Sequence, residues 1–235
     1  MDVANRHALV GILLTNALTL IIAMWQSWSV LQLLWPFWLQ SVIIGWYARQ
    51  RILLLTRFCT KGVRINNRAV APTVETQQKT ALFFALHYGF FQLFYLIVLL
   101  VFTLTSDPNG FIEVTREGSR EVVALYVGRV RPLDWWIFSG LALGFWKTHQ
   151  LSHREHVQAD LGNTPHIGTL MMMPYARIIP MHLCIVLAAP LGGGHVIWIF
   201  IILKTVADLL MHVVEHRVLQ RRRGSEPASD RAGNF

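Results

Sequence analysis

The sequence predicts an all-α, polytopic membrane protein, a bundle of about six transmembrane helices. Of its 235 residues, 54% are hydrophobic and only 14% are charged, whereas soluble domains average about 25% charged residues. Apolar stretches of about 20 residues, long enough to cross a bilayer as a helix, recur along the chain. The net charge of +8 gathers in short segments beside these stretches, which favours a topological role for the basic residues over nucleic-acid binding.

Six apolar segments are expected to span the membrane: residues 7–26, 29–48, 80–105, 133–151, 176–192 and 196–217. The first has no signal-peptide cleavage site after its apolar core, so we expect a retained helix. Prolines bracket the fifth, which leaves a kinked or partly embedded helix open. The uncharged turn "PLGGGH" joins the last two as an antiparallel hairpin. Residues 1–218 thus form the transmembrane domain, and the polar residues 219–235 are expected to be a disordered cytoplasmic tail.

The distribution of Lys and Arg predicts the orientation of these helices. Segment 49–79 carries seven basic residues against one acid, Glu75, whereas segment 106–131 carries four arginines and four acids. Basic loops stay on the cytoplasmic side, so we expect both termini in the cytoplasm of a bacterial inner membrane and segment 106–131 outside. The alternating pattern "GFIEVTREGSREVVALYVGR" predicts a small β-hairpin or cap in that outer segment. Cys59 and Cys184 lie in a basic loop and an apolar run, so no disulfide is expected between them.

Polar residues from several predicted helices converge on the cytoplasmic half of the bundle. At about 1.5 Å per helical residue, His87 lies about 12 Å inside and Gln40 about 13 Å. The others that reach this half are His149, His153, His156, Arg177, His182, Lys204, Asp208, His212 and His216. Intramembrane ionisable groups are costly and are by default candidates for function.

Two stretches concentrate these residues on one helix face. In "HQLSHREH", His149, His153 and His156 follow the spacing i, i+4, i+7, which can present imidazoles to one metal or can mark a solvated helix end. In "LKTVADLLMHVVEH", Asp208 and His212 are oxygen and nitrogen ligand candidates one turn apart. An internal ion pair of Asp208 with Lys204, one turn away, is the alternative.

The order of motifs resembles a bacterial family of integral membrane proteins classed as a domain of unknown function. The resembling elements are "WPFWLQSVIIGWYARQRIL", "LFFALHYGFFQLFYLIV", "LSHREHV", "MMPYARIIPMHLCIVL" and "ILKTVADLLMHVVEH". The family pattern usually has an acid where Gln40 stands, and a second histidine where Phe94 or Tyr95 occurs. The resemblance implies an inner-membrane, multi-span protein whose polar residues belong together.

The favoured interpretation is a metal site in the cytoplasmic half, redox or hydrolytic in its chemistry if it is catalytic. Its expected ligands are His87, His182, Asp208 and His212, with His153 as a further one, and imidazole with carboxylate suits Zn, Fe or Cu. Arg177, Lys204 and Gln40 would balance charge or hold an anionic substrate. Two alternatives stay open: a b-type haem held between two histidines, and a proton- or ion-coupled transporter using an Asp/His/Lys relay. The lipid bilayer is the expected partner, while homo-oligomerisation and a small-molecule or lipid substrate stay open.

Overall fold

The computed structural model describes residue 14 and residues 16–179, except residues 66, 116–121 and 178. This part of the chain is mostly helical. The predicted spans 176–192 and 196–217 and the tail 219–235 lie almost wholly outside the described residues, so the number of six helices stays a prediction.

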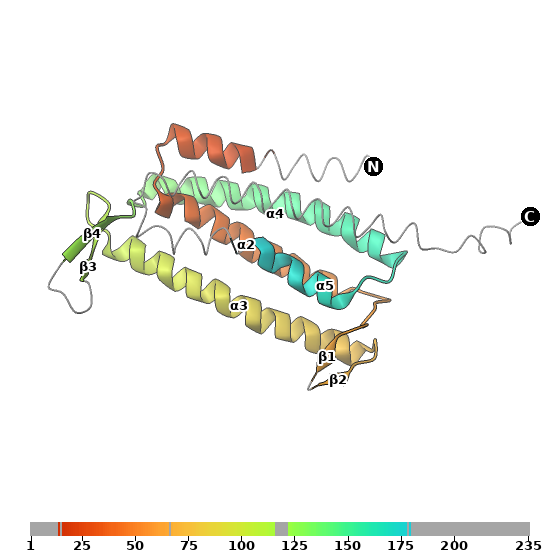
Figure 1. Cartoon of the computed structure of the whole chain (residues 1–235). Coiled ribbons are helices and arrows are strands. Elements are labelled where there is room, and N and C mark those ends of the chain that lie inside the picture. Colours follow the sequence, from red (N-terminus) through yellow and green to blue (C-terminus); the bar gives the residue numbers. More distant parts are fainter. Residues whose placement is uncertain (1–13, 15, 66, 116–121, 178, 180–235) are drawn as a thin grey trace, which may run out of the picture.

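Three long helices form the described bundle: α2 (Val30–Leu53), α3 (Val74–Thr105) and α4 (Pro132–Leu161). The predicted spans 29–48, 80–105 and 133–151 fall almost entirely within them. Helix α2 packs against both α3 and α4 and lies between them, while the N-terminal helix Asn16–Trp25 runs beside α4 (Figure 1). Helices α2 and α3 are long and apolar enough to cross a membrane.

Short hairpins connect the long helices at opposite ends of the bundle. Strands β1 (Arg64–Ile65) and β2 (Arg68–Ala69) lie between α2 and α3, and β3 (Phe111–Thr115) pairs antiparallel with β4 (Val122–Tyr126) between α3 and α4. The hairpin predicted for the second connection is therefore confirmed. Figure 1 shows the two hairpins at opposite ends of the bundle. The predicted orientation requires this, because it places segment 49–79 in the cytoplasm and segment 106–131 outside.

Local hydrogen bonds stabilise the first turns of α3 and α4. The hydroxyl of Thr73 accepts a hydrogen bond from the amide of Thr76 at the start of α3, which satisfies one of the unpaired amides of a first turn. At the start of α4, Pro132 has no amide to leave unpaired. The carboxylate of Asp134 accepts from the amide of Arg131 at 2.7 Å.

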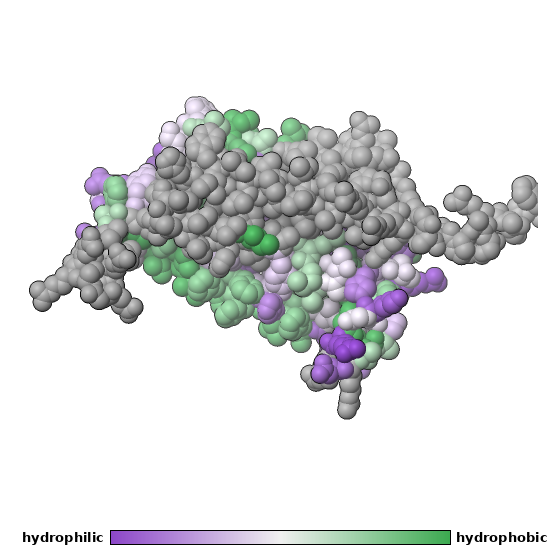
Figure 2. Space-filling view, viewed as in Figure 1, coloured by the Kyte–Doolittle hydropathy of each residue, from purple (hydrophilic) through white to green (hydrophobic). Residues whose placement is uncertain are grey.

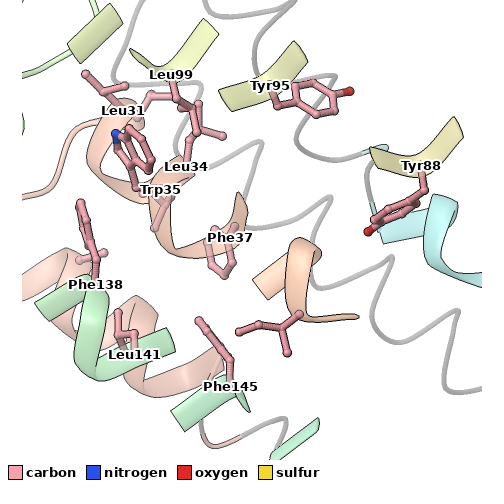
Figure 3. Packing of buried hydrophobic residues seen from close by; sticks show 14 of the residues in the cluster. Leu31, Leu34, Trp35, Phe37, Tyr88, Tyr95, Leu99, Phe138, Leu141 and Phe145 are labelled. Atoms are coloured by element: carbon pink, nitrogen blue, oxygen red, sulfur yellow. The ribbon is translucent and has the colours of Figure 1, made fainter. Parts of the chain in front are cut away.

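The apolar core is centred on α2. Figure 3 shows Leu31, Leu34, Trp35 and Phe37 of α2 facing side chains from both neighbouring helices. These neighbours are Tyr95 and Leu99 of α3 and Phe138, Leu141 and Phe145 of α4. In its most apolar stretch α2 is 67% buried and α3 only 28%, so α2 is the central helix of the described part.

A short helix and a 3-10 turn follow α4: α5 (Ile167–Met172) and η1 (Met173–Arg177). Both pack against α2, and α5 also packs against α3. Backbone bonds from Cys59 to Pro165 (2.9 Å) and from Ile167 to Cys59 (3.1 Å) join this segment to the loop after α2. The fifth span was predicted to start at residue 176, so α5 and η1 are elements that the hydropathy pattern missed.

Candidate functional site

His87 projects from α3 toward the η1 turn. Its Nδ1 lies 2.8 Å from the hydroxyl of Tyr175. The ring stacks on Phe83 at 5.4 Å between ring centroids and meets Phe91 edge-on at 5.2 Å. The imidazole is exposed, and these rings and the Tyr175 hydroxyl set its orientation.

Tyr175 links His87 to the buried face of α3. Its ring packs edge-on against Phe84 at 6.0 Å and against Tyr88 at 5.5 Å. The hydroxyl of Tyr88 donates a 2.8 Å hydrogen bond to the carbonyl of Ser41 on α2. Figure 3 shows Tyr88 on α3, next to the short helical segment that follows α4. Elements α2, α3 and η1 therefore meet around this group of aromatic side chains.

A second polar group joins α2 to the end of α4. The guanidinium of Arg51 donates to both carboxylate oxygens of Asp160, at 2.6 and 3.0 Å, in a bidentate ion pair. His153 lies beside it, with its ring 5.1 Å from that of Tyr47. Burial lowers the pKa of His153, the charge of Arg51 lowers it further, and Asp160 opposes them. This imidazole lies beyond residue 151, where the predicted span ends.

A third polar group lies at the opposite end, between α2 and α4. Asp134 is fully buried and accepts hydrogen bonds from Gln32 Nε2 (2.7 Å) and Arg131 Nη2 (2.9 Å). The amide and hydroxyl of Ser29 donate to Gln32 Oε1 at 2.9 and 3.0 Å. No motif in the sequence predicted this group. Its one signal in the sequence is an acid in a first helical turn, two residues after the Arg131–Pro132 pair.

Residues 2–225 match the family described as "Family of unknown function (DUF6498)". The chain belongs to the DUF6498 family. This membership confirms the resemblance to a domain of unknown function. No curated protein matches the chain, and no solved structure does either.

In this DUF6498 member, two of the five predicted ligands fall within the described residues. His87 lies on α3 and His153 on α4, two helices that both pack on α2. The ring of His87 contacts Tyr175, whereas the ring of His153 contacts Tyr47. Within that part, no group of three or more His, Cys, Asp or Glu side chains could hold a metal ion. His182, Lys204, Asp208 and His212 lie outside the described residues. The predicted metal site thus stays a prediction.

The remaining predicted residues are placed only in part. Gln40 is buried on α2, where its Nε2 lies 3.3 Å from Asn16 Oδ1 of the N-terminal helix, so it faces that helix. Arg177 ends η1, and its side chain lies outside the described residues. His149 is buried in α4 and His156 is half-buried further along it.

Proposed function

We propose that the protein is an integral membrane protein of the bacterial inner membrane, with six spans and cytoplasmic termini, that binds a transition metal in its cytoplasmic half. The observation that carries the membrane assignment is the apolar exposed face of α3. Its exposed side chains include Leu82, Phe83, Leu86, Phe90, Leu93, Phe94, Ile97, Leu100, Val101 and Leu104. Its buried residues combine Thr76, Gln77, Thr80 and Gln92 with aromatic and aliphatic side chains such as Phe84, Tyr95 and Leu99. A surface helix of a soluble protein exposes charged and polar side chains instead.

Helix α4 supports the same assignment. Asp134, His149, Ser152 and Asp160 are buried, while exposed positions include Leu133, Trp136, Leu143 and Leu151. Exposed apolar side chains along a helix suit contact with lipid better than contact with water. Figure 2 shows the apolar surface along α3 and polar residues gathered at the β1–β2 end.

Exposed tryptophans support a bilayer with its boundary near the β3–β4 end. Trp25 ends the N-terminal helix, and Trp135 and Trp136 lie in the first turn of α4; all three side chains are exposed. Tryptophan is enriched where membrane meets water, because its ring is apolar and its indole N–H can bond to the headgroup region.

The arrangement of His87 supports the proposed metal centre. A metal-bound histidine usually has its second ring nitrogen hydrogen-bonded, which fixes the ring and its tautomer. Tyr175 holds Nδ1 of His87 in this way, and Nε2 is the atom that would bind the ion. In the proposal His182, Asp208 and His212 complete the site, His153 is a further ligand, and Arg177, Lys204 and Gln40 balance charge. Zinc, iron or copper fits this set of donors.

Elemental analysis and a visible spectrum of detergent-purified protein test the metal proposal. We expect one equivalent of metal in the wild type and loss of it in His87→Ala. Absence of metal and of a Soret band in the wild type would exclude both the metal and the haem interpretations and leave the Asp/His/Lys relay.

Tyr175→Phe separates the role of the hydroxyl from that of the ring. Removing a hydrogen-bond partner of a metal ligand costs about 10–100-fold in metal affinity, so we expect a loss of that size in a competition titration with a chelator. Tyr126→Phe, in the hairpin at the far end, is the matched control and should bind as the wild type does. Equal affinity of Tyr175→Phe and wild type would contradict the ligand role of His87.

Reporter fusions test the orientation. A reporter placed after Arg223 should read as cytoplasmic, and one inserted at residues 116–121 should read as periplasmic. The reverse result would move the site to the outer half of the bundle. Equal readings at both places would mean an even number of spans between them, which contradicts the three spans predicted there.

A further inference from the structure

The loop that follows α2, residues 54–73, is held firmly against the rest of the protein. Besides the two backbone bonds between Cys59 and the segment before α5, Nε2 of His166 lies 2.7 Å from the carbonyl of Lys61. Within the loop, the hydroxyl of Thr60 donates to the carbonyl of Val70 at 2.7 Å, and β1 pairs with β2. These bonds use backbone atoms of Cys59 and Lys61, so they leave the basic side chains of the loop unused.

The loop presents positive charge without compensation. The side chains of Arg57, Lys61 and Arg64 are exposed, and none of them forms an ion pair within the part of the chain that the structure describes. The sequence from residue 49 to residue 73 contains no Asp or Glu. The next acid, Glu75, pairs with Lys79 at 2.6 Å, so it does not neutralise the loop.

The loop lies next to the level at which the apolar surface stops. Leu54, directly after α2, is 51% exposed, and the run of exposed apolar side chains on α3 begins at Leu82, which is 58% exposed. In a membrane, such side chains lie at the edge of the hydrocarbon region, and the charges just beyond them lie among the headgroups. Figure 2 shows this change from apolar to polar surface at the β1–β2 end.

We propose that loop 54–73 is a binding surface for the headgroups of anionic phospholipids, with Arg57, Lys61 and Arg64 as the contacting side chains. The inference rests on the proposed membrane function. Arginine matches the geometry of a phosphate with two parallel N–H donors, and basic segments next to a membrane helix are attracted to anionic lipid. Because the loop is already ordered, binding requires little further loss of conformational freedom.

The test uses the full chain in detergent, with its melting temperature measured after addition of phosphatidylglycerol or phosphatidylcholine. A ligand that binds only the folded state raises the melting temperature. We expect a larger rise with phosphatidylglycerol, and loss of most of the difference in the triple variant Arg57→Gln, Lys61→Gln, Arg64→Gln. Arg129→Gln, an exposed arginine at the opposite end of the bundle, should keep the full difference.

High salt tests the same charges without a substitution. Raising the ionic strength from about 0.1 to 1 M shortens the screening length from about 10 to 3 Å, so the phosphatidylglycerol effect on the wild type should shrink. Equal shifts with both lipids, an equal loss in Arg129→Gln, or the same shift with inorganic phosphate would each overturn the proposal. Failure of the protein to fractionate with membranes would instead overturn the membrane function itself.

Discussion

At the residue scale, Gly45 shows how α2 and α3 approach each other. A Cβ atom at this position would lie against the ring of Tyr88, with Cδ1 at 2.8 Å. That ring cannot move aside easily, because it is buried and its hydroxyl is bound to the carbonyl of Ser41. A hydrogen at position 45 is therefore a packing requirement of this helix pair.

We predict that Gly45→Ala destabilises the bundle. Overpacking a buried contact costs about 1–3 kcal/mol, which exceeds the gain of about 1 kcal/mol that Ala usually brings over Gly in a helix. The melting temperature of the purified protein should fall. Gly89→Ala is the matched control on α3, where an added Cβ has open space. This control substitution should be neutral or stabilising. Equal melting temperatures for Gly45→Ala and Gly89→Ala would contradict the packing argument.

His153 is the second feature at this scale. Its pKa is lowered by burial and by Arg51, whereas a histidine in an unfolded chain has a pKa of about 6.5. Between these two values the unfolded chain binds more protons than the folded one, so stability falls as the pH drops below about 6.5. The melting temperature of His153→Gln should depend less on pH than that of the wild type between about pH 7.5 and 5.5. Parallel curves for the two proteins would contradict the lowered pKa.

At the scale of elements, polar side chains rather than apolar contacts alone join the helices at their ends. Gln77 of α3 donates from Nε2 to the carbonyls of Ile52 and Leu55, at 2.8 and 2.9 Å, which satisfies two acceptors at the C-terminal end of α2. The Arg51–Asp160 pair joins that same end to α4. These bonds hold α2 in register with both neighbouring helices.

A double-mutant cycle at Arg51 and Asp160, with Met and Asn substitutions, should show strong coupling. The two side chains are only 14% and 8% exposed, and breaking a buried pair on one side costs about 3–5 kcal/mol. The pair Lys79–Glu75 is 63% and 75% exposed and serves as the control, with an expected coupling of about 0.2–1 kcal/mol. Unfolding in denaturant measures both cycles. Similar couplings for both pairs would show that burial does not strengthen the α2–α4 link.

At the scale of the whole molecule, the apolar exposed face of α3 determines the expected effect of a new charge. On the surface of a soluble protein, a lysine in place of an exposed leucine is tolerated. At the centre of a bilayer the same change costs at least about 2.5–3.5 kcal/mol.

Leu93→Lys, in the middle of α3, should therefore reduce the amount of protein recovered from alkali-washed membranes. Leu104→Lys lies at the end of the same helix, where the long side chain can reach the headgroups, and it should insert normally. Both leucines are exposed, at 55% and 79%. Equal recovery of the two variants would argue against a membrane-spanning α3.

The helical class, the approximate positions of three long helices and the β3–β4 hairpin are predictable from the amino-acid sequence. Hydropathy and alternation are local properties, and each of these elements is recognisable from its own residues. Family membership was equally predictable, because motif order is a property of the sequence alone.

Which polar side chains contact one another depends on the packing of the helices. Hydrogen bonds join Asp134 to Gln32, Arg51 to Asp160, and His87 to Tyr175. These pairs are separated by 102, 109 and 88 residues in the sequence. A depth estimate assigns residues to a level in the membrane but not to a side of α2. For that reason it grouped His87 with His153, whereas the described structure gives them separate partners, Tyr175 and Tyr47. Pairing depends on how helices rotate and pack about their axes, and that information resides in the assembled core rather than in any one segment.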